Sequence, residues 1–163
     1  MKLPQVIQHK IFSSRDIVFQ CSRWKLLSKT ISFTNGCFDI LHPGHISSLS
    51  DAAREADFLI VGLNSDTSAR RLKGEGRPVM DEHSRALILA SLLIVDAVVI
   101  FEEDTPLELI QIVQPDVLVK GGDYTIDQIV GAREVQAAGG RVVINPILAG
   151  FSTTGIIGKI RSL

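Results

Sequence analysis

Short apolar segments alternate with longer segments of helical character along most of this chain, and this alternation constrains the fold more than any other feature. Residues 58–63 are all apolar apart from one glycine, as is typical of a parallel strand covered on both faces. Strands that alternate with longer helices predict an α/β fold, here a single-domain, Rossmann-like parallel sheet of five strands with helices on both faces. The expected strands are 31–34, 58–63, 97–101, 117–120 and 141–145.

The expected helices lie between these strands and near both ends of the chain. Ser14 is a candidate N-cap for the first of them, whose apolar side chains recur at helical spacing. Pro43 suits the first turn of the next helix, and Gly139-Gly140 is a normal C-terminal stop for a later one. The predicted helices are 14–29, 43–56, 81–93, 106–113, 127–138 and one from 152 onward, whereas 65–80 is expected to be a polar, glycine-containing loop.

Length and composition predict a single domain that covers residues 1–163, of which residues 1–30 form an N-terminal helical extension. At 163 residues, 45% of them hydrophobic and 21% charged, the chain can bury a core without disulfides. The formal net charge of -1 gives no global attraction to nucleic acid or to an anionic membrane. Cys21 and Cys37 match no zinc-binding spacing. Without a signal peptide or a bilayer-spanning stretch, the sequence predicts a cytoplasmic protein with no nucleic-acid or membrane partner.

The strongest functional motif, residues 34–45 (TNGCFDILHPGH), joins the first predicted strand of the alternating unit to the next helix. Two of the four histidines, His42 and His45, lie three residues apart at this helix start, where free N–H groups and the helix dipole favour a phosphate. Gly44 removes a side chain where a phosphate would approach closely. Imidazole N–H groups here can stabilise charge that develops during phosphoryl transfer. The alternatives are one capping and one core histidine, or a two-histidine metal site that lacks a suitably spaced third ligand.

Missing motifs narrow the class of reaction. The chain contains no GxxxxGK[ST] P-loop, and no GxGxxG follows the first strand. No Ser, Cys or Lys presents itself as an activated nucleophile with a base partner. A phosphate monoester that attacks the α-phosphate of a nucleoside triphosphate needs no such nucleophile, because it is already an anion. Catalysis then depends on positioning and charge neutralisation.

Several other segments are candidates for the rest of a phosphate-binding pocket. Residues 70–78 carry four cations in a glycine-containing run, and Arg85 follows on the next predicted helix; a solvated loop and a surface arginine are the alternatives. Asp66 can cap a helix or face the ligand. The segment 120–124 (KGGDY) allows backbone contact with a base or ribose, and 152–154 presents hydroxyls and N–H groups at a helix start. A plain turn and ordinary N-capping are their alternatives.

At these residues the sequence resembles the cytidylyltransferase-like (HxGH) nucleotidyltransferase family, from about residue 18 to the C-terminus. The strings RLKGEGRP, FEEDTP and VKGGDY resemble most closely the family's heptose 1-phosphate adenylyltransferase branch. This branch transfers AMP from ATP, with Mg²⁺, to D-glycero-β-D-manno-heptose 1-phosphate, giving ADP-heptose for lipopolysaccharide synthesis. In many bacteria the domain is fused to a sugar kinase, for which this chain is too short, so a stand-alone form is expected.

Two alternatives to this function stay open. One is a cytidylyltransferase that acts on glycerol 3-phosphate or another polyol or sugar phosphate. The arginine that such enzymes carry before the last helix is absent from residues 147–154 (ILAGFSTT), which weakens that alternative. The other is a non-catalytic nucleotide-binding sensor module, which has less need of the transition-state donors that the histidines offer.

The resemblance also implies roles for individual residues. His42, His45 and Lys73 would be catalytic. The nucleotide would be bound by Asn35, Gly36, Cys37, Phe38, Gly44, His45, Gly122, Asp123, Ser152, Thr153 and Thr154. The acceptor phosphate would be bound by Asp39, Lys73, Arg77 and Arg85, and no residue is assigned to a resident metal.

The expected partners are small molecules, a nucleoside triphosphate and a sugar phosphate. A homo-oligomer is also expected, with a dimer as the simplest form. The apolar residues Ile11, Phe12 and Val18 can cover a dimer surface or pack on their own domain.

Overall fold

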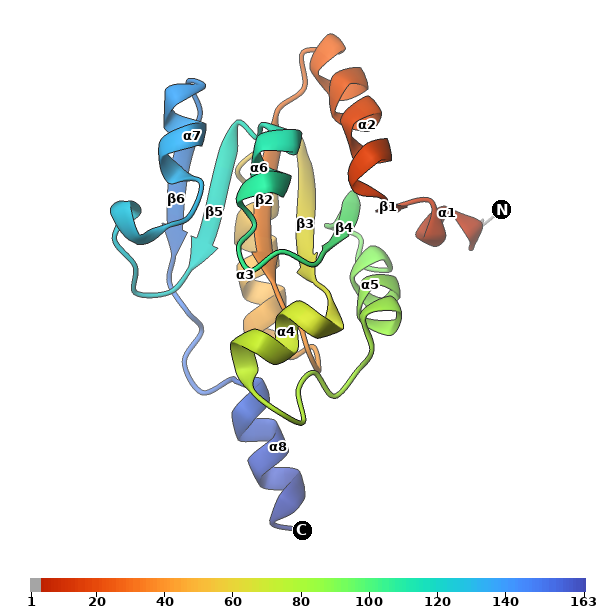
Figure 1. Ribbon diagram of the computed structural model, residues 1–163, viewed down its shortest axis with the longest axis vertical. Coiled ribbons are helices and arrows are strands. Elements are labelled where there is room, and N and C mark those ends of the chain that lie inside the picture. Colours follow the sequence, from red (N-terminus) through yellow and green to blue (C-terminus); the bar gives the residue numbers. More distant parts are fainter. Residues whose placement is uncertain (1–3) are drawn as a thin grey trace.

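A parallel sheet of six strands in the order β1-β4-β3-β2-β5-β6 forms the centre of the structure (Figure 1). The computed structural model describes residues 4–163, so residues 1–3 of the predicted N-terminal extension lie outside the described part. The strands are β1 (Ile11–Phe12), β2 (Ile31–Gly36), β3 (Phe58–Asn64), β4 (Ala97–Phe101), β5 (Val117–Gly121) and β6 (Arg141–Asn145).

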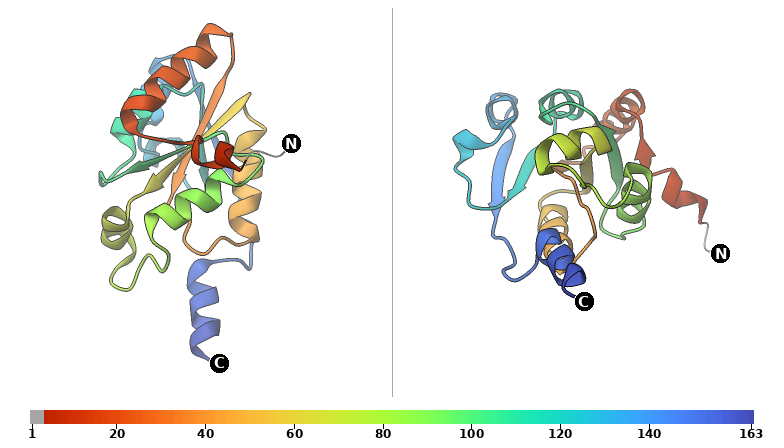
Figure 2. Two further views of the ribbon diagram at one scale, coloured as in Figure 1. Left: turned by 90° about the vertical axis from the view of Figure 1, so that its right-hand side faces the viewer. Right: turned by 60° about the horizontal axis from the view of Figure 1, so that its bottom comes forward.

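Helices cover both faces of this sheet, which confirms the predicted α/β fold. Helices α2, α6 and α7 cover one face of the sheet, and α3 and α5 cover the other (Figure 2). Their apolar side chains form the two hydrophobic clusters of the core. The helices are α1 (Gln5–Gln8), α2 (Ser14–Leu26), α3 (Pro43–Ala53), α4 (Asp66–Lys73), α5 (Glu82–Ala90), α6 (Leu107–Val113), α7 (Ala132–Ala137) and α8 (Thr153–Arg161), with one 3₁₀ turn, η1 (Ile126–Gln128). None of the helices in residues 4–163 has the length and apolarity needed to cross a membrane.

The sheet has one strand more than predicted, because the extension expected to be helical contains β1. This strand has only two residues, which is too short for an alternating pattern to be recognised. Ile11 pairs with Val98, and Phe12 pairs with Val99 of β4. Both β1 side chains pack against the domain's own core, whereas Val18 on α2 is exposed.

The prediction of a loop over 65–80 is wrong for its first half, which forms α4. Ser65 caps this helix by accepting a hydrogen bond from the N–H of Ser68 at 3.1 Å, and three cations in its last turn suit the negative end of the helix dipole. The helix ends at Gly74, whose φ of 88° is readily adopted only by glycine.

Two other predicted helix boundaries also change. Ser13 rather than Ser14 caps α2, through a 3.1 Å hydrogen bond from the N–H of Asp16. The helix predicted over 127–138 is only the short α7, because the chain forms η1 first and then takes a φ of 85° at Gly131.

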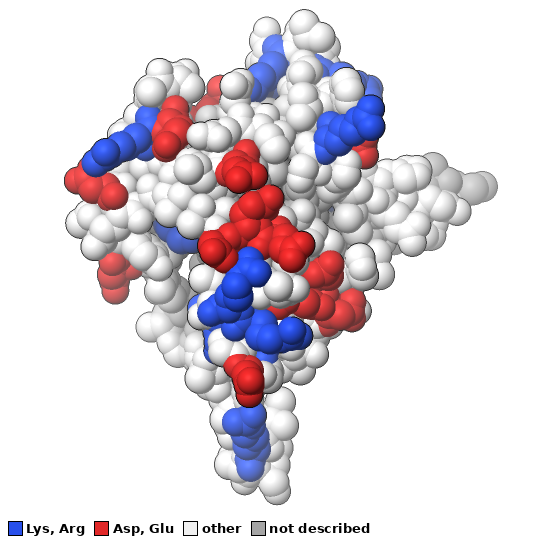
Figure 3. Space-filling view, in the orientation of Figure 1, with Lys and Arg blue, Asp and Glu red and all other residues white. Residues whose placement is uncertain are grey.

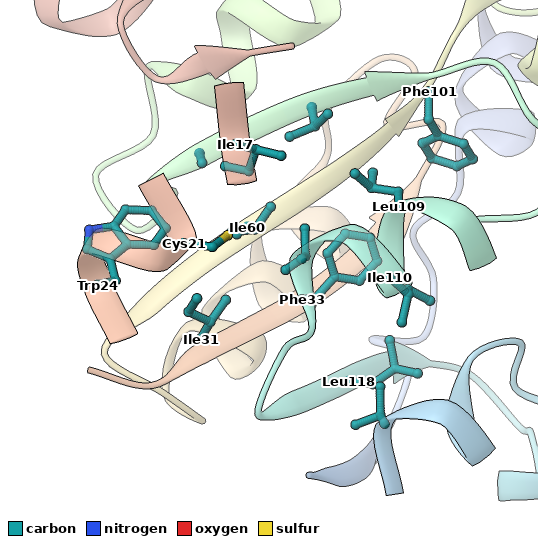
Figure 4. Close-up of a cluster of buried hydrophobic side chains, with 14 of the residues drawn as sticks. Ile17, Cys21, Trp24, Ile31, Phe33, Ile60, Phe101, Leu109, Ile110 and Leu118 are labelled. Carbon is teal, nitrogen blue, oxygen red and sulfur yellow. The ribbon is translucent and has the colours of Figure 1, made fainter. Parts of the chain in front are cut away.

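The larger hydrophobic cluster fills the space between the sheet and α2, α6 and α7 (Figure 4). Trp24 stacks on Phe58 at its edge, with ring centroids 4.2 Å apart. Phe33 of β2 lies at the centre and is fully buried. Its ring occupies the space above Gly62 of β3, where a Cβ would lie 2.7 Å from Phe33 Cζ. The glycine within this apolar strand therefore makes room for the ring.

The order of the strands fixes where a ligand can bind. From β2 the chain continues through β3 to β4 on one side, and it then returns to place β5 on the other side of β2. In open parallel sheets, ligands bind beyond the carboxyl ends of the strands at such a switch point. Here the starts of α3 and α8 lie beyond that end. Helix α8 projects away from the rest of the fold and has no buried residue (Figure 1).

We predict that Gly62→Val lowers the free energy of unfolding by about 1–3 kcal/mol, the usual cost of overpacking a core, because the new side chain meets the ring of Phe33. Urea unfolding of the purified variant measures this. Adding Phe33→Leu should recover part of the loss. Gly158→Ala on α8, where an added Cβ meets nothing within 4 Å, should cause no loss; equal losses at both glycines would contradict the packing argument.

Candidate active site

A pocket of about 420 Å³ lies at the carboxyl ends of β2 and β5. Its wall also includes the starts of α3 and α8 and part of the segment between α4 and α5. Most of the site residues predicted from the sequence line this pocket: Asn35, Gly36, Cys37, Phe38, Asp39, His42, Gly44, His45, Lys73, Arg77, Ser152, Thr153 and Thr154. Segments more than a hundred residues apart in the sequence therefore meet here.

The two histidines are held together at the start of α3. His42 is the N-cap residue, and its Nδ1 accepts a hydrogen bond of 3.3 Å from the backbone N–H of His45. The two imidazole rings stack with centroids 3.8 Å apart and an angle of 17° between their planes. A Cβ on Gly44 would lie 3.1 Å from the His42 ring and 3.3 Å from Cβ of Phe151. Glycine at this position therefore allows the ring and the segment before α8 to approach the helix start.

Burial lowers the pKa of both imidazoles and so favours their neutral forms. Burial, with a smaller effect of neighbouring His42, lowers the pKa of His45 to about 4, and burial also lowers the pKa of His42. Because Nδ1 of His42 accepts a hydrogen bond, its remaining proton lies on Nε2. Nδ1 of His45 is buried and has no hydrogen-bond partner among residues 4–163. The pair thus supplies polar N–H groups to the pocket without carrying full charge in the free protein.

The four cations of residues 70–77 separate into two groups. Lys73 and Arg77 line the pocket. Arg71 instead pairs with Asp104 at 2.6 Å, and Arg70 is exposed. On the face seen in Figure 1, a basic cluster lies next to an acidic cluster (Figure 3). Only part of the basic run is therefore available to a ligand in the pocket.

Asp39 lines the pocket, but its carboxylate is engaged in holding the loop before α5. The side chain is 1% exposed and pairs with Arg77 at 2.9 Å. It also accepts hydrogen bonds from the N–H groups of Val79 and Met80 at 2.9 and 3.1 Å. Although burial raises the pKa of Asp39, these N–H groups and Arg77 bring it below its ordinary value. The carboxylate is therefore an anion that orients Arg77, and like charge disfavours its direct contact with a phosphate.

The backbone of Asp39 also anchors the last helix. The hydroxyl of Thr153 donates a 2.7 Å hydrogen bond to the Asp39 carbonyl oxygen. Ser152 caps α8 by accepting a 3.0 Å hydrogen bond from the N–H of Gly155. The first bond holds the first turn of α8 at the pocket, and the second caps the helix.

Lys120 is a pocket residue that the sequence analysis did not assign. It lies near the end of β5, with Nζ 3.5 Å from Oδ1 of Asn35 and 6.0 Å from the ring centroid of Tyr124. Burial lowers the pKa of Lys120, and the charge of Lys73 lowers it further. The two lysines therefore face the same space. A lysine near the end of an otherwise apolar strand was the available signal, since the ends of central strands point into the site.

Three predicted site residues do not line the pocket. Arg85 was expected to meet the acceptor phosphate, but its side chain is 1% exposed. Its guanidinium donates to three backbone carbonyl oxygens: Cys37 (2.6 Å), Asn64 (2.9 Å) and Met80 (2.9 Å). It also pairs with Asp66 at 2.6 Å. Asp66 therefore neither caps a helix nor faces the pocket, and the arginine holds loops together.

Gly122 and Asp123 are the other two predicted site residues that do not line the pocket. The φ of Gly122 is +131°, and a Cβ there would lie 2.8 Å from Cε2 of Tyr124. This glycine therefore seats the tyrosine ring instead of lining the pocket. The side chain of Asp123 is exposed and also lies outside the pocket wall.

Comparison with known proteins agrees with this geometry. A model of the cytidylyltransferase-like family matches residues 33–159, the part of the chain that contains the pocket. The chain belongs to the cytidylyltransferase-like family. Its fold, its HxGH motif and its relatives are those of a nucleotidyltransferase enzyme.

The similar proteins include longer bacterial relatives. The "bifunctional protein HldE" of Mesorhizobium japonicum is 56% identical over 98% of this chain and 32% of its own length. That of Nitrobacter hamburgensis is 57% identical over 92% of this chain and 31% of its own. The chain thus spans about a third of the length of the curated relatives it matches.

Solved structures share the fold. A "lipopolysaccharide core biosynthesis protein" from Thermoplasma volcanium has a TM-score of 0.60 and 28% identity, over 74% of this chain and 97% of its own. A pantoate-β-alanine ligase from Francisella tularensis has a TM-score of 0.59 over 94% of this chain and 78% of its own. At 18% identity, the second likeness concerns the fold alone.

We predict that Arg85→Leu lowers the free energy of unfolding by about 3 kcal/mol or more, because it leaves buried carbonyl groups and Asp66 without their partner. Urea unfolding measures this. Arg54→Leu is the matched control, since that side chain is 76% exposed in its ion pair with Asp51, and it should change stability by less than about 1 kcal/mol. If Arg85→Leu is as stable as the wild type but binds the acceptor more weakly, Arg85 contacts the substrate and the structural role is wrong.

We also predict that His45 makes the stability depend on pH. Its pKa is about 4 in the folded chain and close to 6.5 when exposed, so the unfolded chain takes up the proton first as the pH falls. The stabilising effect of the neutral ring is complete above pH 6.5 and is lost as the pH falls toward 4. In urea unfolding, His45→Gln should depend less on pH over this window than the wild type. Parallel stability curves would show that His45 does not titrate in this way.

Proposed function

We propose that this chain is an adenylyltransferase that moves AMP from ATP to D-glycero-β-D-manno-heptose 1-phosphate and releases pyrophosphate. The observation that carries the proposal is one pocket with two neutral imidazoles at a helix start and two lysines, Lys73 and Lys120, in its wall. The heptose branch is supported by the RLKGEGRP, FEEDTP and VKGGDY strings. The lipopolysaccharide-related name of the Thermoplasma volcanium protein is consistent with it.

The reaction needs donors for the triphosphate and cations for the acceptor. The triphosphate would lie at the starts of α3 and α8, where backbone N–H groups of the first helical turns are available and residues 152–154 line the pocket. An oxygen of the acceptor phosphate attacks the α-phosphorus, and the bond to the β-phosphate oxygen breaks, so that pyrophosphate leaves with the electron pair. The N–H groups of His42 and His45 would stabilise the charge on the α-phosphate oxygens. Lys73 and Lys120 would hold the acceptor phosphate.

Mg²⁺ is the metal that the resemblance implies. In residues 4–163, no group of three or more His, Cys, Asp or Glu side chains is arranged to hold a metal ion, and the Asp39 carboxylate is engaged by Arg77. Mg²⁺ commonly binds through substrate phosphates with few protein ligands. We therefore infer that it enters with the triphosphate, and that the protein residues act on the phosphates directly.

The test is pyrophosphate release in the presence of Mg²⁺, with ATP or CTP crossed against heptose 1-phosphate or glycerol 3-phosphate. Turnover only with ATP and the heptose phosphate is expected. Turnover with CTP and glycerol phosphate would keep the reaction type and overturn the substrates. ATP binding without turnover in any combination would favour a nucleotide sensor.

We predict that His45→Ala lowers kcat by at least ~100-fold, the usual scale for one lost transition-state donor. Steady-state pyrophosphate release measures the effect, and circular dichroism checks that the fold is retained. His83→Ala is the matched control, because His83 is exposed on α5 and outside the pocket wall, and its kcat should stay at the wild-type value. Normal turnover by His45→Ala would remove this ring from the mechanism.

A further inference from the structure

A smaller hollow of about 190 Å³ opens beside the main pocket, and we call it the side chamber. The two spaces share three wall residues, Asn35, Lys120 and Tyr124. The start of α6 and the segment around the end of η1 form the rest of its wall: Pro106, Gln128, Ile129 and Val130. The side chamber therefore adjoins the main pocket on the side of β5.

Tyr124 lies at the junction between the two spaces because of the glycine beneath its ring. A Cβ on Gly122 would lie 2.8 Å from Cε2 of the tyrosine, so a larger residue would displace the ring. The ring centroid lies 6.0 Å from Nζ of Lys120. If the phosphate of a ligand contacts Lys120, the part of the ligand bonded to that phosphate therefore lies next to the ring of Tyr124.

The side chamber has the mixed polarity that suits a polyhydroxylated ring. The amide oxygen of Gln128 accepts a 2.9 Å hydrogen bond from the N–H of Thr125, and that of Asn35 lies 3.5 Å from Lys120 Nζ. Both side chains keep their NH₂ groups to donate to hydroxyls, and the phenol of Tyr124 can donate and accept. Pro106, Ile129 and Val130 add apolar surface, and an aromatic ring can pack on the C–H face of a sugar. Among the described residues, no carboxylate belongs to the chamber wall, so a phosphorylated ligand meets no like charge there.

We propose that the side chamber binds the sugar body of the acceptor, while the acceptor phosphate lies between Lys120 and Lys73 in the main pocket. This inference rests on the proposed function, to which it adds the place where the acceptor is selected. Tyr124 and Val130 are then specificity-determining residues.

The nucleoside fits the side chamber less well. The side chamber has a volume of about 190 Å³, which is below the ~300–1,000 Å³ of pockets that hold larger small molecules. The chamber therefore suits a single sugar ring. The triphosphate sites at the starts of α3 and α8 belong to the main pocket and not to the chamber wall.

The test is Val130→Phe, which places a larger side chain in the chamber at a position that is 42% exposed. We expect the KM for heptose 1-phosphate to rise roughly tenfold or more while the KM for ATP stays within about twofold, since only contacts with the acceptor change. Val18→Phe on α2 is the matched control: it is 40% exposed and lies outside both walls, and both KM values should stay unchanged.

Each result decides the proposal. An unchanged KM for the heptose phosphate in Val130→Phe, or a rise in the KM for ATP alone, would overturn the assignment of the chamber. Val130→Met, a smaller enlargement at the same partly exposed position, gives the same test if Val130→Phe does not fold. Wild-type protein without any pyrophosphate release would instead overturn the proposed function itself, and the two failures are thereby distinguished.

Discussion

The buried guanidinium of Arg85 connects the segments on which the pocket depends. It contacts the chain just after β2, the last residue of β3 and the loop that precedes α5, and it pairs with Asp66 at the start of α4. Such a charge is stable in the interior only when it is paired and hydrogen-bonded, and here each of the three guanidinium nitrogens has a partner. The loop that carries Arg77 is thereby fixed against the loop that carries Asp39. The geometry of the pocket residues Asp39 and Arg77 thus depends on a side chain that does not line the pocket.

The electrostatics of the pocket differ from those of the whole molecule. The chain has a formal net charge of -1, yet Lys73, Arg77 and Lys120 all line one concave space. Clefts lined by one sign of charge concentrate ligands of the opposite sign. The histidines add polar N–H groups without further charge, because burial keeps their pKa values low. A polyanionic substrate can therefore be attracted without two more buried cations.

The sequence predicted the alternating strands and the HxGH helix start because both follow from local rules. A buried parallel strand needs a continuous apolar run, as in β3, and Pro43 with two histidines marks the start of α3. It did not predict β1, which has two residues, or α4, whose side chains are mostly polar. Arg85 was predicted to bind the acceptor phosphate, with a surface arginine as the alternative. Its buried position was not predicted, because its partners lie up to 48 residues away in sequence.

Two further differences have the same origin. Lys120 lies near the end of an apolar strand, which was a signal in the sequence, but its position beside Asn35 and Lys73 depends on the order of the strands. Gly122 was predicted to contact the nucleotide, and that role stays a prediction; its neighbour in the fold, the ring of Tyr124, is visible only in three dimensions.

Helix α8 combines a role in the pocket with weak support from the rest of the fold. Its first turn belongs to the pocket wall, but none of its nine residues is buried. Isolated helices of this length are marginal in water, and regions with few buried contacts open locally at low free energy. A phosphate bound at its N-terminus would stabilise the folded helix by mass action. Occupancy of the pocket and order in α8 are therefore linked. A nucleotide that binds at the first turn of this helix would slow amide hydrogen exchange in its last turns, although those turns lie outside the pocket wall.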